Sequence, residues 1–342
     1  MPSGRPWADR MAAEARWWKN EGASVRCLLC PHLCVIGPGG TGLCGVRAGA
    51  QETNGRGSLS LPGYGFVTAE AADPIEKKPL YHFLPGSPVW SIGFAGCNLD
   101  CPFCQNHEIA RAPAGSGRRR TPDEVVAVAA SSGSRMIAYT YSEPTVHFEF
   151  VVAAAERARK AGLKNVLVTN GCLNPGPAAE LLDLMDAVNI DVKSWNPTYY
   201  RDVLRGNLAT VRAFVEAAVE RCWTELTTLV VPDDNDSDTD MAEMCSWIAS
   251  LSPVIPLHLS AYHPSYKYGR SATDAESLRR FRNVAKGRLT FVYVGNIGWE
   301  NDTACPGCGA AVIERKFYST RSALAGNACP ECGTVVPGVF DV

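Results

Sequence analysis

The chain has 342 residues, of which 46% are hydrophobic and 20% charged, and its formal net charge at pH 7 is −2. This composition is that of an ordinary globular protein with a large core. The near-zero charge gives no overall field that would favour nucleic acid or an anionic membrane as a partner. No run of about 18 apolar residues is present, and residues 1–20 lack the apolar core of a signal peptide, so we expect a cytoplasmic protein.

Three segments follow one another along the chain. Residues 1–86 carry four cysteines and a glycine- and proline-rich run, residues 87–297 alternate short apolar runs with helical stretches, and residues 298–342 form a small tail with four more cysteines. Because we expect a reducing compartment, clustered cysteines are interpreted as metal ligands rather than as disulfides.

The first segment contains Cys27, Cys30, Cys34 and Cys44. Four thiolates with this spacing could hold a structural zinc ion, or an auxiliary [4Fe–4S] cluster that relays electrons or binds substrate. The pattern narrowly favours zinc or another structural metal. His32 is expected to be a neighbour of the site rather than a ligand.

The second segment begins with an apolar run, residues 89–94, followed by Cys97, Cys101 and Cys104 in a C-x3-C-x2-C spacing. Three thiolates this close can bind three irons of a [4Fe–4S] cube and leave the fourth iron open to an outside molecule. A zinc site normally has four ligands, and no fourth one stands at a usual spacing. Pro102 disfavours a disulfide. The spacing therefore predicts an iron–sulfur cluster with one open iron.

Seven apolar runs in this segment are interpreted as parallel strands with helices between them. They span residues 89–94, 136–141, 165–171, 187–193, 225–231, 256–262 and 289–296. The alternation indicates right-handed β-α-β crossovers. We therefore predict an α/β fold, a partial or near-complete parallel β/α (TIM-like) barrel, with a doubly wound sheet as the structural alternative.

Polar residues follow the ends of several strands, where barrels of parallel strands carry their catalytic groups. Glu143 follows the second strand and Asn170 the third, Asp191 and Lys193 close the fourth, and His263 follows the sixth. Each also has a plain structural interpretation: a loop acid for Glu143, an ion pair for Asp191 with Lys193, and packing for His263. Their shared place at the strand ends favours a binding site.

The tail contains two knuckles of the form CPxCG, which supply Cys305, Cys308, Cys329 and Cys332. Four thiolates in such turns close a tetrahedral metal site. The pattern predicts a zinc ribbon or rubredoxin-like fold, with zinc favoured over iron because the site looks structural. No basic cluster surrounds it, so we expect a docking or capping role rather than nucleic-acid binding.

Several stretches together resemble one family. They are DPIEKKPLYHFLPG, GCNLDCPFCQNHEIA, YTYSEPT, TNG, DVKSWN, ELTTLVVP, LHLSAYHP, VYVGN and the closing CPxCG pairs, from about residue 26 to 341. In this combination the chain resembles the AmmeMemoRadiSam-system radical S-adenosylmethionine (SAM) proteins of the pyruvate formate-lyase-activating-enzyme-like branch. The resemblance implies a [4Fe–4S] cluster on Cys97, Cys101 and Cys104, and SAM contacts from Glu143, Asn170, Asp191, Lys193 and His263. One departure is the acidic loop of residues 231–236, where a Pro-Gly is common in the family.

The prediction is a radical SAM enzyme. Its reduced cluster cleaves SAM to a 5′-deoxyadenosyl radical, which abstracts hydrogen from a small-molecule or peptide substrate, with flavodoxin or ferredoxin as the external one-electron donor. A glycyl-radical-enzyme activase is one alternative. A non-catalytic iron–sulfur electron-transfer or scaffold protein is the other. No residue is assigned a catalytic role beyond cofactor binding.

Overall fold

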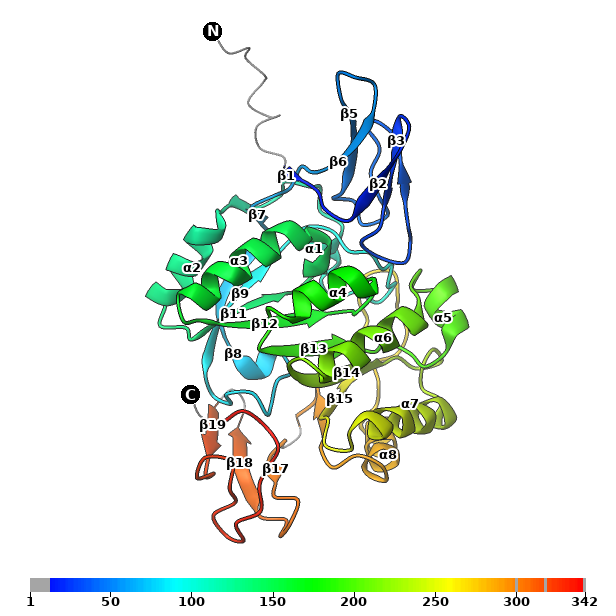
Figure 1. Ribbon diagram of the computed structural model, residues 1–342. Helices are drawn as coiled ribbons and strands as arrows, with labels where there is room; N and C mark the ends of the chain where they lie inside the picture. The colour runs from blue at the N-terminus through cyan, green and yellow to red at the C-terminus, as the bar shows by residue number, and fades with distance from the viewer. Residues whose placement is uncertain (1–12, 299–300, 317–318, 341–342) are drawn as a thin grey trace.

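The computed structural model describes residues 13–298, 301–316 and 319–340 (Figure 1). Its centre is an eight-stranded sheet with the order β16-β15-β14-β13-β12-β11-β9-β8. β8 (Ala69–Pro74) pairs antiparallel with β9. The other seven strands run parallel; they are β9 (Pro88–Gly93), β11 (Met136–Thr140), β12 (Lys164–Thr169), β13 (Ala187–Asp191), β14 (Trp223–Val230), β15 (Leu257–Ala261) and β16 (Val292–Gly295).

The predicted α/β fold is confirmed, and the barrel is partial. From β9 to β16 the strands lie in chain order. A doubly wound sheet would reverse its order at a switch point, so that alternative is wrong. Each of the seven predicted apolar runs contains one parallel strand, whereas β8 was not predicted.

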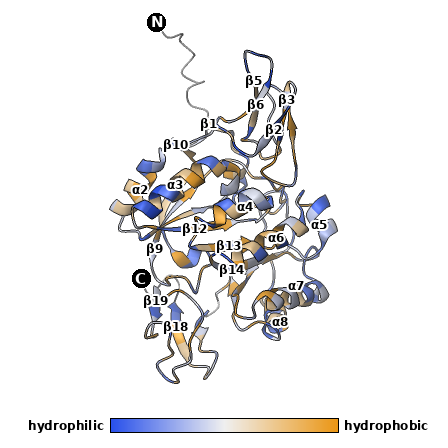
Figure 2. Cartoon of the chain, in the orientation of Figure 1, coloured by the Kyte–Doolittle hydropathy of each residue, from blue (hydrophilic) through white to orange (hydrophobic). Residues whose placement is uncertain are grey.

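Helices connect the parallel strands. They are α1 (His107–Ala110), α2 (Pro122–Ser131), η3 (Pro144–His147), α3 (Phe148–Lys160), α4 (Pro175–Leu182), α5 (Pro197–Asp202), α6 (Leu208–Val219), α7 (Asp238–Leu251) and α8 (Ala275–Lys286). Figure 2 shows hydrophilic and hydrophobic residues mixed along α2 and α3, as expected of helices with one buried face. No helix within the described ranges has the length and apolar character needed to cross a membrane.

The two faces of the sheet belong to different clusters of the core. In β11, Ile137 and Tyr139 pack with the helices, whereas Met136 and Ala138 face the inside of the partial barrel. The inner face is covered by the segment Ile75–Leu84, which begins with η2 (Ile75–Lys77). Its apolar residues pack against the first residues of β9, β11 and β13, so this segment fills the amino-terminal end of the partial barrel.

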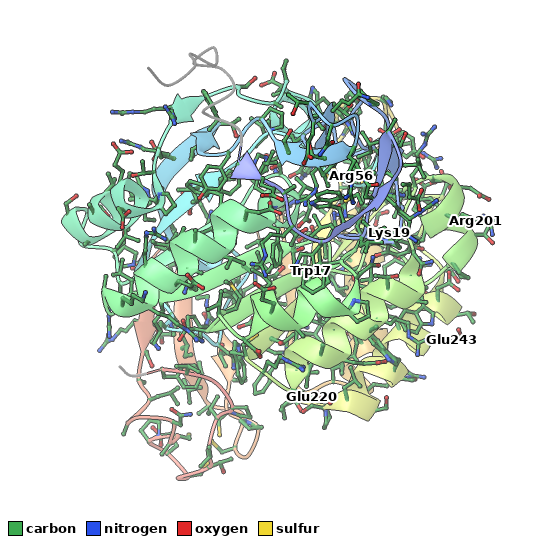
Figure 3. All side chains as sticks on the ribbon, turned by 45° about the horizontal axis from the view of Figure 1, so that its top comes forward. Trp17, Lys19, Arg56, Arg201, Glu220 and Glu243 are labelled. Atoms are coloured by element: carbon green, nitrogen blue, oxygen red, sulfur yellow. The ribbon has the colours of Figure 1, made fainter. Side chains whose placement is uncertain are left out.

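The N-terminal residues form small antiparallel sheets beside the barrel. They comprise β1 (Ala13–Glu14), β2 (Trp18–Glu21), β3 (Ser24–Cys27), β4 (Val35–Ile36), β5 (Ala48–Gln51), β6 (Gly57–Leu61) and β7 (Phe66–Val67), the last paired with β10 (Arg118–Arg119). Trp17 packs edge-on against Phe148 of α3, at a ring-centroid distance of 6.3 Å (Figure 3). Residues 1–12, which include most of the stretch examined for a signal peptide, lie outside the described residues.

The tail forms a three-stranded sheet of β17 (Thr303–Ala304), β18 (Ala311–Lys316) and β19 (Ser319–Ser322). It contacts the segment Ile75–Leu84 directly. The backbone N–H of Leu84 donates to the carbonyl of Val339, at 2.6 Å, and the N–H of Val339 donates to the carbonyl of His82, at 2.8 Å. The tail is thus attached near the amino-terminal end of the partial barrel.

Candidate functional site

A cavity of about 460 Å³ lies at the carboxyl ends of the parallel strands. Of the rim and loop residues predicted from the sequence, it is lined by Cys97, Cys101, Cys104, Glu143, Asn170, Asp191 and Lys193. His263 is not part of this lining. It is exposed, and its Nε2 lies 3.0 Å from the carbonyl oxygen of Asn296, which does line the cavity.

The three cysteines after β9 form one wall of this cavity. Burial raises the pKa of Cys101 to about 11 and also raises the pKa of Cys97 and Cys104. Such thiols stay protonated until a metal replaces the proton. The N–H of Leu99 points at Cys97 Sγ, at 3.4 Å, a donor suited to a cluster-bound sulfur. The donor set therefore fits an iron–sulfur cluster.

Glu143 joins the ends of β11 and β12. Its Oε1 accepts hydrogen bonds from the backbone N–H and the hydroxyl of Thr145 and from the hydroxyl of Thr169, at 3.1, 2.6 and 2.8 Å. Among the described residues, its Oε2 accepts from one donor, the backbone N–H of Asn170, at 2.8 Å. Burial raises the pKa of Glu143, and these hydrogen bonds oppose the rise. Oε2 retains a lone pair for a cationic group.

The side chain of Asn170 holds the cysteine loop in place. Its Nδ2 donates to Asn98 Oδ1, at 2.9 Å, and lies 3.8 Å from Cys97 Sγ, while its Oδ1 accepts from the N–H of Cys172. Asn98 in turn donates to the carbonyl of Cys172. Asn98 was not singled out from the sequence, because nothing local marks its contact with a residue 72 positions away.

Asp191 and Lys193 form an ion pair in the cavity wall, with Nζ 3.0 Å from Oδ2. Burial alone lowers the pKa of Lys193, but the charge of Asp191, together with that of Cys101 when it is ionised, outweighs burial and raises it. Lys193 in turn acts to lower the pKa of Cys101, although burial dominates there. The ammonium of Lys193 thus lies close enough to the cysteine loop to affect its thiols, although Asp191 balances its charge.

A second polar group in the cavity wall was not predicted as part of the site. Asp73, the penultimate residue of β8, accepts hydrogen bonds from Lys78 Nζ at 2.8 Å and from the Tyr141 hydroxyl at 2.7 Å. The ammonium of Lys78 lies 4.5 Å from the centre of the Tyr141 ring. Although burial raises the pKa of Asp73, these donors lower it well below its usual range. The signal available in the sequence was the lysine pair, Lys77 and Lys78, shortly after Asp73 and Glu76.

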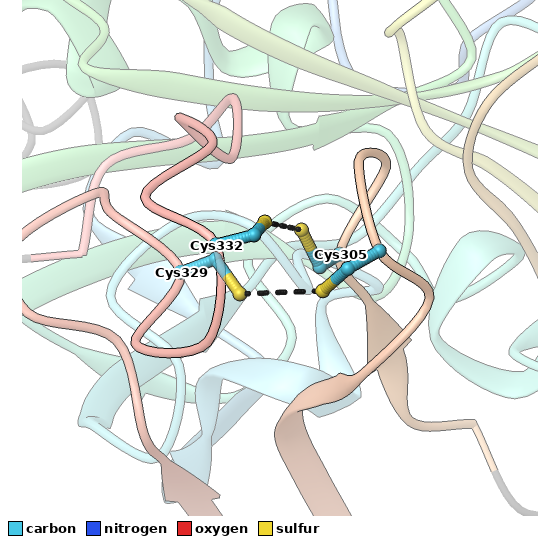
Figure 4. Close-up of side chains that lie close together, drawn as sticks. Cys305, Cys329 and Cys332 are labelled. Carbon is cyan, nitrogen blue, oxygen red and sulfur yellow. Dashed lines mark hydrogen bonds between the residues drawn. The ribbon is translucent and has the colours of Figure 1, made fainter.

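The four tail thiols gather at one point (Figure 4). Cys305 Sγ lies 3.6 Å from Cys332 Sγ, and Cys308 Sγ lies 3.7 Å from Cys329 Sγ. Tetrahedral coordination with bonds of about 2.3 Å places thiolates about 3.8 Å apart. These four residues can therefore hold one metal ion.

The four N-terminal cysteines line one enclosed pocket. Burial raises the pKa of Cys27, Cys30 and Cys44. His32 also lines the pocket, and its Nε2 contacts the carbonyl oxygen of Asn98, at 2.7 Å.

The family model described as Radical SAM superfamily matches residues 91–245. The chain is also 39% identical over 311 residues to the uncharacterized protein MJ0808 of Methanocaldococcus jannaschii, a match that covers 89% of this chain and 91% of that protein. The chain belongs to the radical SAM superfamily. Membership implies a [4Fe–4S] cluster and SAM as cofactors. The matched range includes the cavity residues from Cys97 to Lys193, but neither His263 nor the two outer cysteine groups.

Other proteins match over shorter stretches of the chain. A GTP 3′,8-cyclase of Heliobacterium modesticaldum is 31% identical over 170 residues, which are 48% of this chain and 50% of that enzyme. The crystal structure of Streptococcus suis SuiB matches with a TM-score of 0.50 at 13% identity, over 65% of this chain and 52% of that one. The second likeness shows the fold alone.

Proposed function

We propose that this protein is a radical SAM enzyme acting on a small molecule or peptide, with Cys97, Cys101 and Cys104 holding a [4Fe–4S] cluster whose open iron binds SAM. When bound and reduced, the cluster splits SAM to a 5′-deoxyadenosyl radical that takes a hydrogen atom from the substrate. The observation that carries this proposal is that the three thiols share one cavity with the polar residues at the strand ends. Assignment to the AmmeMemoRadiSam group stays a proposal based on the sequence motifs.

The residues around the cavity have distinct proposed roles. Glu143 Oε2 suits the ammonium of SAM, since this oxygen accepts a single hydrogen bond from the part of the chain that the structure describes. Lys193 suits the SAM carboxylate, with Asp191 orienting its ammonium. Asn170 acts as a positioning residue, since its amide is already bonded to Asn98. His263 would act from the rim, through its contact with Asn296.

Two further features support hydrogen abstraction from a bound substrate. The wall includes apolar side chains such as Leu99, Phe103 and Leu229, which exclude water from a reactive radical. Asp73 and Lys78 line the same cavity and are not needed for SAM in this proposal, so we assign them to the substrate. A volume of about 460 Å³ lies within the ordinary range for small-ligand sites.

The deciding experiment is SAM cleavage by anaerobically reconstituted protein with dithionite. We expect methionine and 5′-deoxyadenosine from the natural protein and none from Cys101→Ala. Cys245→Ala is the matched control, since Cys245 is also buried but lies on α7, outside the cavity lining. Reversible cluster redox without SAM cleavage would instead identify an electron-transfer protein. A glycine-centred radical on a partner, seen by electron paramagnetic resonance (EPR), would identify an activase.

The remaining assignments are proposals of the same kind. Zinc in the tail site, flavodoxin or ferredoxin as reductant and a cytoplasmic location rest on the cysteine pattern and composition of the chain. Metal analysis of the purified protein tests the first, because a tail site filled by zinc adds about one zinc ion per chain.

A further inference from the structure

The metal bound by the N-terminal cysteines can be inferred from the spacing of their thiols. Within the described part of the chain, the tail cysteines are the group in which all ligand atoms lie within 4.8 Å of one another. Cys27, Cys30, Cys34 and Cys44 surround one pocket without gathering three thiols that closely. A single zinc ion needs thiolates about 3.8 Å apart. A [4Fe–4S] cube holds its four thiolates roughly 6 Å apart.

The cysteine loop of the SAM site provides an internal comparison. Cys97, Cys101 and Cys104 lie in the part of the chain that carries the superfamily match, and they too fail to gather within 4.8 Å. The N-terminal group therefore resembles the expected iron–sulfur site, and differs from the tail site, in that no three of its thiols lie within 4.8 Å of one another. This favours iron–sulfur over the zinc that the sequence pattern narrowly favoured.

A buried arginine supports an anionic group in this pocket. Arg47 lines the pocket and is 1% exposed. Its two terminal nitrogens donate to Glu149, at 3.0 and 3.1 Å, and one also donates to the carbonyl of Arg16. Its Nε is buried and has no hydrogen-bond partner among the described residues. Leaving such a donor unpaired is costly, and a cluster sulfur in the pocket would accept from it.

The two cysteine loops are in direct backbone contact. The N–H of Cys97 donates to the carbonyl of Cys44, at 3.3 Å. Gly96 permits this approach: its φ is +89°, and a Cβ at this position would lie 2.6 Å from the Cys44 carbonyl oxygen. His32 also reaches the carbonyl of Asn98 in the second loop. One hydrogen bond thus separates a cysteine of each site.

We propose that Cys27, Cys30, Cys34 and Cys44 hold an auxiliary [4Fe–4S] cluster that passes single electrons to the SAM-site cluster through the Cys44–Cys97 contact. In each transfer the auxiliary cluster is oxidised by one electron and the SAM-site cluster is reduced by one, and no bond or proton changes place. A low-potential protein that donates one electron, such as a flavodoxin, then reduces the auxiliary cluster again. The relay rests on the proposed function, whereas the metal assignment does not.

The metal assignment is tested in the variant Cys97→Ala/Cys101→Ala/Cys104→Ala, reconstituted anaerobically with iron and sulfide in the presence of zinc. We expect it to keep about four irons and four sulfides per chain, with an EPR signal of a reduced cubane. The matched variant Cys27→Ala/Cys30→Ala/Cys34→Ala/Cys44→Ala should keep only the other cluster. An iron-free triple variant with two zinc ions per chain would overturn the assignment, whether or not SAM is cleaved.

A second measurement keeps all four N-terminal cysteines. The double variant Arg47→Gln/Glu149→Gln deletes the buried ion pair without leaving a lone charge. Built on the triple-alanine background, it should shift the midpoint potential of the remaining cluster, because the unpaired Nε–H donor is lost. An unchanged potential would contradict the position assigned to the cluster beside Arg47.

The relay is tested by comparing two reductants. With reduced flavodoxin, the variant lacking the four N-terminal cysteines should lose SAM cleavage, whereas dithionite, a small reductant, should still support it. Equal activity with flavodoxin in variant and natural protein would overturn the relay. If the natural protein fails with both reductants, the proposed function itself is wrong, and the iron content of the triple variant still decides the metal assignment.

Discussion

At the scale of single residues, Glu143 is the best-connected polar group of the cavity. Its carboxylate accepts four hydrogen bonds, from residues on η3 and at the end of β12. Burial raises its pKa, so its ionised form depends on these donors. The same carboxylate raises the pKa of Cys97, which links it electrostatically to the cysteine loop.

The substitution Glu143→Gln should weaken SAM binding by about 10-fold to 100-fold, since a hydrogen bond to a charged group contributes about 1.5–3 kcal/mol. The variant should also have lower thermal stability. The amide NH2 of Gln replaces one carboxylate oxygen of Glu143, so that a hydrogen-bond donor then faces the donors that surround this side chain. Equilibrium SAM binding and thermal unfolding measure the two effects. Glu220→Gln, an exposed change (76% for the side chain), is the control and should alter neither (Figure 3).

Lys78 and Asp73 form a buried pair, with side chains 2% and 7% exposed. Lys78→Met should destabilise the fold by about 3 kcal/mol, because the Asp73 charge loses its main partner. The double variant Lys78→Met/Asp73→Asn should recover part of this loss. Denaturant unfolding of these two variants and of Asp73→Asn gives the coupling free energy between the two side chains. Additive losses would show that the two side chains act independently.

Local patterns in the sequence mark most of the residues that are proposed for the site. The cysteine spacings and the polar residues after strand ends are local signals, and all of the latter except His263 line the cavity. The hydrogen bond between Tyr141 and Asp73 joins residues 68 positions apart, so no local sequence pattern could predict it. His263 follows its strand as predicted, yet its ring contacts the backbone of Asn296 at the exposed rim.

At the scale of elements, the parallel strands were predictable because each is a short, buried apolar run between helices. β8 was not, because Ala69–Pro74 has no β-branched or aromatic residue and forms the antiparallel edge of the sheet. The six strands β1 to β6 are each two to five residues long, which is too short for an argument from hydrophobic periodicity. Their arrangement depends on distant contacts.

α2 begins with a capping box formed by Thr121 and Glu124. Thr121 Oγ1 accepts from the N–H of Glu124, at 3.2 Å, and Glu124 Oε2 accepts from the N–H of Thr121, at 2.7 Å. Thr121→Ala should lower the free energy of unfolding by about 1 kcal/mol. Thr121→Ser keeps the acceptor and should leave stability nearly unchanged. Equal losses in both variants, measured by urea unfolding, would show that the cap is not what stabilises the helix.

At the scale of the whole molecule, two buried histidines make stability depend on pH. Burial lowers the pKa of His82 and of His147 to about 4, from an ordinary value of 6.5. The unfolded chain therefore binds protons that the folded one does not, and stability falls as pH drops from about 6.5 to about 4. His82→Gln should flatten this dependence, measured as melting temperature between pH 7 and pH 5. An unchanged slope would show that His82 is not among its sources.

The segment Ile75–Leu84 touches both ends of the partial barrel. Lys78 lines the cavity, whereas Leu84 and His82 share backbone hydrogen bonds with Val339 of the tail. A chelator that removes a metal ion from the tail cysteines should therefore destabilise the part of the cavity wall that this segment forms. Hydrogen–deuterium exchange would detect this as faster labelling of the Leu84 amide. In separate assays, we expect weaker substrate binding while SAM is still cleaved. We therefore expect the tail to stabilise the cavity wall from a distance, through the segment Ile75–Leu84.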